Sequence, residues 1–177
     1  CCQKRAVHIN EYRYYGQVKI KGQVGVLYLT TINGLPMSVF IDFKYQQFYF
    51  LDLSACKSIF KPELYDDTVF EVTLIKPTDS RQNQQKSPIL VISDVYVWCG
   101  QCLYYQSFLV RYQIWSQYDY HGSDLDIYSK DAVKYDQLRS FMNDYVSTLP
   151  YVQEITGLIF YPDYNPHHHI MINENFS

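Results

Sequence analysis

Five short apolar runs in the first 98 residues constrain the fold more than any other feature of the sequence. They cover residues 18–29, 37–43, 47–53, 67–75 and 89–98, and the last of them, ILVISDVYVW, is rich in β-branched side chains. Runs of this length and composition predict β-strands. The Asn33-Gly34 pair between the first two runs is a strong hairpin signal. The first half of the chain is therefore expected to form antiparallel sheet.

The second half mixes helical and extended patterns. The segment SKDAVKYDQLRSFMNDYVSTLP predicts a helix over roughly residues 130–149, capped by Ser129 and stopped by Pro150. Residues 107–115 fit either a helix or a strand, residues 155–162 predict a buried strand, and residues 78–88 predict a surface loop. The apolar stripe of the expected helix consists of Leu138, Phe141, Met142, Tyr145 and Leu149. These elements predict an α+β fold that is mainly antiparallel β with a few helices.

Length, charge and cysteine count limit the class of protein. A chain of 177 residues suits one domain, so residues 1–177 are expected to form a single domain, excised from a longer protein because the chain starts without Met. The net charge of −3 excludes a generally basic nucleic-acid coat but allows a local basic cleft. No apolar run approaches 18 residues, so we expect no membrane span. An odd count of five cysteines without a secretory signal predicts an intracellular protein, cytoplasmic or nuclear.

The CxxC pair Cys99 and Cys102 raises the hypothesis of a thioredoxin-like oxidoreductase. Such a dithiol is activated when it lies between a strand and the N-terminus of a helix, whose dipole lowers the pKa of the first thiol. The run ILVISDVYVW supplies a strand before Cys99. Against the hypothesis, 98 residues of mostly antiparallel pattern precede the pair, and Pro150 lacks the context of the cis-proline that faces such a dithiol.

Four short motifs, taken in order, resemble those of the covalent nucleotidyltransferase superfamily, which includes the mRNA capping guanylyltransferases. KIKG at residues 19–22 is similar to the Lys-x-Asp-Gly turn that holds the nucleophilic lysine. TVFEVTLI matches the family's second motif through its glutamate, Glu71. SDVYVWCG matches the third motif through its aspartate, Asp94. EITGLIF is similar to the fourth motif of the family, whose glutamate corresponds to Glu154. The resemblance covers most of residues 17–162 and implies a guanylyltransferase-like fold.

One branch of the superfamily is closer in pattern. The cap-binding domain of snurportin, which uses this fold without catalysis, resembles the present chain in its DVYVWCG and GLIFYP segments. This resemblance implies that Cys99 to Cys102 form a turn after a buried strand, in which Gly100 supplies the special backbone conformation. It also implies that Trp98 stacks on the cationic base of a methylated cap, although a core position for Trp98 is an equal alternative.

The remaining candidate residues follow from the same resemblance. Lys19 and Lys21 are candidates for binding cap phosphates, Glu71 for accepting hydrogen bonds from the guanine edge, and Glu154 for a place in the nucleotide site. Each has an alternative as an ordinary solvated strand residue. Asp94 lies in an apolar run and is expected to have a partner.

Departures from the family pattern argue against catalysis. Lys21 stands where the nucleotidyltransferases have Asp, and Thr156 replaces the Asp of the last motif. No lysine pair follows in HHHIMINENFS, and no OB-fold domain is present in these residues. Loss of these groups should cost many powers of ten in rate. We therefore expect a non-catalytic module whose partner is capped RNA or a guanine nucleotide, with no membrane partner and with protein partners reached through other domains of the full-length chain.

Three alternatives stay open. One is a guanylyltransferase with Lys19 as nucleophile, Mg²⁺ or Mn²⁺ as cofactor and an OB-fold domain elsewhere in the chain; the others are the CxxC oxidoreductase and a purely structural interaction domain. For the non-catalytic module we expect no cofactor. We also expect no metal site, because His167, His168 and His169 point to alternate faces of an extended chain and lack ligands at zinc spacing.

Overall fold

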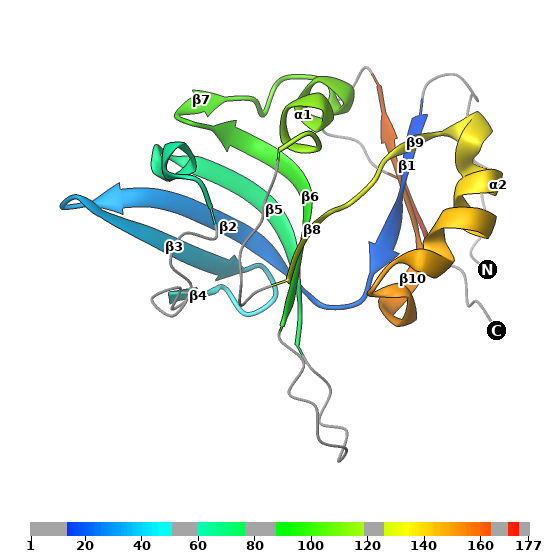
Figure 1. The fold of residues 1–177 in the computed structure, drawn as a ribbon, viewed down its shortest axis with the longest axis horizontal. Coiled ribbons are helices and arrows are strands. Elements are labelled where there is room, and N and C mark those ends of the chain that lie inside the picture. The colour runs from blue at the N-terminus through cyan, green and yellow to red at the C-terminus, as the bar shows by residue number, and fades with distance from the viewer. Residues whose placement is uncertain (1–13, 51–59, 77–87, 119–125, 164–169, 174–177) are drawn as a thin grey trace, which may run out of the picture.

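Two sheets dominate the structure, a computed structural model that describes residues 14–50, 60–76, 88–118, 126–163 and 170–173 (Figure 1). In the larger sheet the strands follow the order β4-β3-β2-β5-β6-β7, and β8 pairs with β6. These strands are β2 (Gln23–Ile32), β3 (Leu35–Asp42), β4 (Gln47–Phe50), β5 (Thr68–Ile75), β6 (Ile89–Trp98), β7 (Gln101–Cys102) and β8 (Asp126–Ser129). The β6–β8 pair is parallel, and all the other pairings among the described strands are antiparallel.

The smaller sheet joins the two ends of the described chain. Its order is β11-β10-β1-β9, built from β1 (Tyr14–Ile20), β9 (Val133–Lys134), β10 (Ile155–Pro162) and β11 (Ile170–Asn173). β1 and β10 pair along their whole length, with Tyr14 opposite Pro162 and Ile20 opposite Ile155. The two sheets lie side by side in Figure 1, and β1 runs directly into β2 across the space between them.

Helical segments are few and short. α1 (Phe108–Trp115) begins after Ser107, whose hydroxyl accepts a hydrogen bond from the Val110 amide at 3.4 Å. A second helical region runs through a 3₁₀ turn (Tyr135–Gln137), α2 (Leu138–Ser140), a π-helical turn (Phe141–Tyr145) and a 3₁₀ turn (Val146–Thr148). Two further 3₁₀ turns cover Pro62–Tyr65 and Val152–Glu154. The described residues thus form an α+β fold dominated by antiparallel sheet, as the sequence predicts.

Most of the predicted strands are confirmed. The runs 37–43, 67–75, 89–98 and 155–162 correspond to β3, β5, β6 and β10, and β4 confirms residues 47–50 of the run 47–53. Residues 51–53 lie outside the described part of the chain, as does almost all of the predicted loop 78–88. The ambiguous segment 107–115 is α1, in which Phe108, Arg111 and Trp115 share one buried face.

The prediction of a single strand over residues 18–29 is wrong. The chain forms two strands in different sheets, and it leaves the smaller sheet at Lys21 and Gly22. Gly22 allows this crossing because a Cβ placed there would lie 2.6 Å from Thr73 Cγ2 and 2.9 Å from the Leu74 carbonyl oxygen. The Lys21 amide donates a hydrogen bond of 2.7 Å to the Glu154 carbonyl oxygen, which fixes the turn.

The helix expected to start after Ser129 begins later than predicted. Ser129 ends β8, where residues 126–129 pair with residues 89–92 of β6, so it does not cap a helix. Helical turns start at Tyr135 and reach Thr148, close to the predicted stop at Pro150. In the predicted apolar stripe Phe141 and Leu149 are buried, whereas Tyr145 is exposed. The edges of two strands hold the chain extended beyond Ser129, because the Lys130 amide donates to the Ile92 carbonyl oxygen of β6 and residues 133–134 pair with β1. A first helical turn would instead leave its amides without partners.

Two tight turns close hairpins with left-handed backbone angles. Asn33 and Gly34 have φ of 53° and 77°, and Cys99 and Gly100 have φ of 46° and 76°. Positive φ at both central residues is what a two-residue hairpin of the favoured hand requires. The first turn confirms the hairpin predicted from Asn33-Gly34, and the second confirms that the CxxC segment is a turn after a buried strand.

The core consists of two clusters. One packs the apolar faces of β2, β5 and β6 against Trp115, Phe60 and Leu64. The other packs β1 against the second helical region through Val18, Phe141 and Val146. No helix in the described residues is long and apolar enough to cross a membrane.

Candidate functional site

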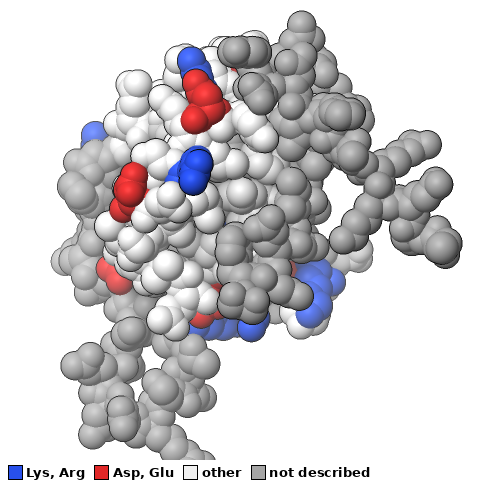
Figure 2. Space-filling model, turned by 90° about the vertical axis from the view of Figure 1, so that its right-hand side faces the viewer, with Lys and Arg blue, Asp and Glu red and all other residues white. Residues whose placement is uncertain are grey.

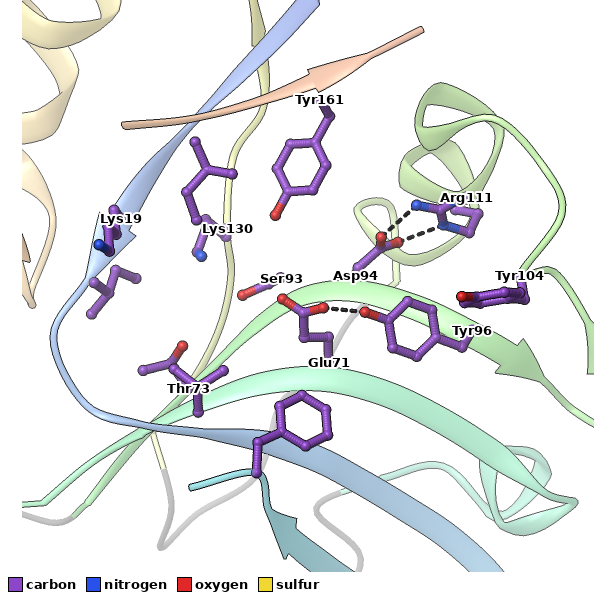
Figure 3. A pocket seen from close by; sticks show the side chains of 14 residues that line it. Lys19, Glu71, Thr73, Ser93, Asp94, Tyr96, Tyr104, Arg111, Lys130 and Tyr161 are labelled. Atoms are coloured by element: carbon purple, nitrogen blue, oxygen red, sulfur yellow. Dashed lines mark hydrogen bonds and ion pairs between the residues drawn. The ribbon is translucent and has the colours of Figure 1, made fainter. Parts of the chain in front are cut away.

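A cavity of about 390 Å³ lies between the two sheets (Figure 3). The smaller sheet contributes side chains from β1 and β10, the larger sheet from β5 and β6, and α1 closes one side. Ten polar or aromatic residues labelled in Figure 3 face it: Lys19, Glu71, Thr73, Ser93, Asp94, Tyr96, Tyr104, Arg111, Lys130 and Tyr161. Among the lining residues three side chains are basic and two are acidic, so the pocket is more positive than the chain as a whole.

The strongest interaction in the pocket joins Asp94 of β6 to Arg111 of α1. Arg111 Nε donates to Asp94 Oδ1 at 2.9 Å and Arg111 Nη2 donates to Asp94 Oδ2 at 2.6 Å. Both side chains are buried, and Arg111 also donates to the Gln106 carbonyl oxygen at 2.6 Å. Burial raises the pKa of Asp94, and the guanidinium acts in the opposite direction. The sequence predicted a partner for Asp94, and the structure supplies Arg111, which binds both carboxylate oxygens.

A second pair joins the neighbouring strands. The Tyr96 hydroxyl of β6 donates a hydrogen bond to Glu71 Oε2 of β5. Glu71 lies opposite Asp94 in the β5–β6 register, which is irregular on both sides of this position. Burial raises the pKa of Tyr96, and the nearby Glu71 carboxylate raises it further, so the phenol stays protonated and remains a donor.

Lys130 is the most buried cation of the pocket after Arg111. Its side chain is 3% exposed, and burial lowers its pKa to about 8, while Glu71 and Asp94 oppose this shift. The sequence interpretation missed Lys130 because it placed this residue on the first turn of a helix. Arg111 was missed because segment 107–115 was left ambiguous, although a helical assignment puts it on the face of Phe108 and Trp115.

The structure brings together two of the five predicted site residues. Lys19 on β1 and Glu71 on β5 both line the pocket. Lys21 is exposed in the crossing between the sheets, and Glu154 is half-buried in a 3₁₀ turn, where its carbonyl oxygen accepts the Lys21 amide. Neither lines the pocket.

Trp98 lies elsewhere, at the end of β6. Its ring contacts Phe70 at 6.0 Å and Tyr118 at 5.2 Å between centroids, both edge to face. Phe70 and Glu71 are consecutive on β5, so their side chains point to opposite faces of the sheet. The half-buried Trp98 therefore packs on the Phe70 face, against the first core cluster, and is not among the residues that line the pocket.

The CxxC segment lacks the surroundings of an activated dithiol. Cys99 lies in the hairpin turn and Cys102 in β7, both as free thiols, and α1 starts only at Phe108. The Cys99 amide donates to Thr68 Oγ1 at 3.1 Å. Burial raises the pKa of the Cys99 thiol, whereas a helix N-terminus would lower it. This geometry argues against a thioredoxin-like function.

A second, more open cavity of about 640 Å³ adjoins the pocket. It shares Val24 and Phe43 with the first and is also lined by Lys44, Tyr45, Tyr49 and Lys76. On the face of the molecule seen in Figure 2, basic and acidic side chains are interspersed and most of the described surface carries no charge. The described residues on that face form no extended basic surface.

Within the described residues there is no group of three or more His, Cys, Asp or Glu side chains that could hold a metal ion. His167, His168 and His169 lie outside the described part of the chain. In comparisons with known proteins, no family model matches the chain and no curated protein matches it.

Proposed function

We propose that the pocket between the two sheets binds a guanine nucleotide or the cap of an RNA, without catalysing nucleotidyl transfer. The observation that carries this proposal is that Lys19 and Glu71, distant in sequence, face the same cavity. They are two of the five positions at which the resemblance to the covalent nucleotidyltransferases implies a nucleotide contact. A concave site with a few convergent polar groups is the usual form of a small-molecule site.

The chemistry of the lining suits such a ligand. An excess of basic over acidic side chains favours an anion, and Lys19 supplies a half-buried ammonium that can meet a phosphate. Glu71 already accepts a hydrogen bond from Tyr96, but a carboxylate accepts several, so it can also accept from the N1–H and N2–H edge of guanine. Phe43 and Tyr104 are 53% and 45% exposed and offer aromatic faces on which a base can stack.

Two positions argue that binding is not followed by covalent transfer. Lys21, in place of the family's Asp, is exposed beside the crossing and does not line the pocket. Thr156, in place of the second Asp, donates its hydroxyl to the Lys19 carbonyl oxygen at 3.4 Å, a structural contact. A carboxylate on the metal side of the phosphate is one of the groups that phosphoryl transfer relies on, and neither position supplies it.

Calorimetric titration with GTP, methylated cap analogues and unmethylated cap dinucleotide tests the proposal. The wild-type chain is expected to bind at least one of them, and Lys19→Met should weaken binding by roughly tenfold or more, since a hydrogen bond to a charged group contributes about 1.5–3 kcal/mol. Lys134→Met, which removes an exposed lysine outside the pocket, is the matched control. Absence of binding to all three ligands overturns the proposal.

Incubation with labelled GTP and Mg²⁺ or Mn²⁺ separates the proposed module from an enzyme. The expected result is no covalent label on the protein that survives alkali, the condition under which a lysine phosphoramidate is stable. A phosphoramidate at Lys19 would establish the guanylyltransferase alternative instead.

A further inference from the structure

Lys130 is held at the junction of the two sheets by its backbone. It directly follows β8, its amide donates to the Ile92 carbonyl oxygen at 2.8 Å, and its carbonyl oxygen accepts Gln17 Nε2 at 3.1 Å. Gln17 Nε2 also lies 3.3 Å from the Ser93 carbonyl oxygen, so β1, β6 and the residue after β8 are tied together. With both sides of its backbone fixed, Lys130 places its side chain among the pocket residues in Figure 3.

The carboxylates that face Lys130 are already engaged. Asp94 receives both hydrogen bonds of Arg111 and a third from the Val95 amide at 2.8 Å. Glu71 receives the Tyr96 hydroxyl. Within the described residues neither carboxylate forms an ion pair with Lys130 at contact distance. A lysine that is 3% exposed therefore has its ammonium in a cavity without a carboxylate in contact, an arrangement that is costly unless another anion arrives.

The charges around Lys130 favour a phosphate as that anion. The groups that face it from the surrounding elements are Lys19 of β1, Glu71 of β5, Asp94 and Tyr96 of β6, Arg111 of α1, Tyr104 before α1 and Tyr161 of β10. Counted with Lys130, this set holds three cations and two carboxylates, so its net charge is positive and suits a phosphate.

We propose that Lys130 is the inner phosphate-binding residue of the pocket and that nucleotide binding is coupled to protonation of its side chain. This inference rests on the proposed function and deepens it, because it assigns the phosphate to the cavity interior and adds a pH dependence. Lys19, which is half-buried, then contacts the phosphate from the outer side.

The sign of the pH dependence follows from burial. Burial lowers the pKa of Lys130 to about 8 in the ligand-free protein, and a bound phosphate raises it because the anion favours the ammonium form. Binding is therefore tightest below the free pKa and weakens as the pH rises through it. For a group of pKa about 8, linkage predicts that affinity falls about fourfold between pH 7.0 and 8.5, a range that avoids ionisation of the guanine base.

The experiment is calorimetric titration of the wild type, Lys130→Met and Lys134→Met with GTP at pH 7.0 and 8.5. At pH 8.5, titrations in two buffers of different ionisation enthalpy give the number of protons taken up. We expect uptake of more than about half a proton by the wild type, and affinity reduced roughly tenfold to a hundredfold, with no pH dependence, in Lys130→Met. Lys134→Met should behave as the wild type.

The outcomes separate this inference from the proposed function. If the wild type binds no GTP or cap analogue at either pH, the proposed function fails. If the wild type binds but takes up no proton, or if Lys130→Met binds within about threefold of the wild type, the inference about Lys130 is wrong while nucleotide binding stands. If Lys130→Met does not fold, the proton uptake of the wild type alone decides.

Discussion

The middle and the end of strand β6 use their side chains in opposite ways. In the middle, Asp94 and Tyr96 point into the inter-sheet pocket and hold Arg111 and Glu71. At the end, Trp98 packs on Phe70 and Tyr118, and the chain turns back immediately. One strand thus carries a buried network of charges and, a few residues later, an aromatic contact that continues the apolar core.

The difference shows which part of β6 is available for a ligand. The aromatic end is stabilised by contacts with its own core, and it does not line the cavity. The polar middle borders a cavity and includes a cation, Lys130, that a ligand can neutralise. Buried polar groups that stay close to unfilled space are typical of functional sites, whereas packed aromatic side chains are typical of structural ones.

The largest effect should come from breaking the Asp94–Arg111 pair. Arg111→Met leaves a buried carboxylate without its partner, and removal of one member of a buried ion pair costs about 3–5 kcal/mol. The free energy of unfolding, measured by urea denaturation, should fall by that amount. Arg139→Met, at an exposed arginine of α2, is the matched control and should change it by less than about 0.5 kcal/mol.

A second substitution sharpens this result. Adding Asp94→Val to Arg111→Met removes the orphaned charge, so the double variant should recover most of the lost stability. If the double variant were no more stable than Arg111→Met alone, the loss would come from arginine packing and hydrogen bonds rather than from the buried carboxylate.

Trp98→Ala should have an intermediate effect that is confined to stability. Truncation of a fully buried Trp costs about 3–5 kcal/mol, so we expect about 2 kcal/mol for this half-buried ring, with Trp98→Phe in between. Cap and GTP affinity should stay within about threefold of the wild type. Tyr105→Ala, at a ring that is 78% exposed, is a control that should leave stability unchanged.

Tryptophan fluorescence tests the opposing hypothesis, in which Trp98 stacks on the base of a methylated cap. If Trp98 stacks on a methylated base, a cap analogue should quench its emission, and Trp98→Ala should lose about ten- to a hundredfold in cap affinity. That pair of results would restore the cap-stacking role and contradict the comparison drawn between the two parts of β6.

The smallest effect is expected from the turn at the end of β6. Replacing both Cys99 and Cys102 by Ser should change the free energy of unfolding by less than about 0.5 kcal/mol, because both are free thiols. Since burial raises the pKa of Cys99, its alkylation by iodoacetamide at pH 7.5 should be slower than that of a free cysteine. Rapid reduction of insulin by the wild type would contradict this view.

Local pattern was sufficient for much of the architecture. Strands β3, β5, β6 and β10 and the Asn33–Gly34 turn were predictable, because apolar runs and turn residues act over a few neighbours. Asp94 was predictable as a buried group in need of a partner for the same reason, since a single charge in a β-branched run cannot be left unpaired. Lys19 and Glu71, which line the pocket, were named as candidates only through a resemblance between short motifs.

Tertiary structure alone decided the rest. Whether Ser129 caps a helix or ends a strand depends on the open edge of β6, which lies 37 residues earlier, counted from Ile89 to Asp126, and which no local pattern reveals. The same holds for the strand break at Gly22, which follows from the closeness of Thr73. The meeting of Lys19, Glu71, Asp94, Arg111 and Lys130 around one cavity is likewise a product of sheet pairing and helix docking. Short-range periodicity and desolvation made four strands and the burial of Asp94 predictable from the sequence. The pocket depends on contacts between segments that are distant in the chain, and only the folded protein supplies them.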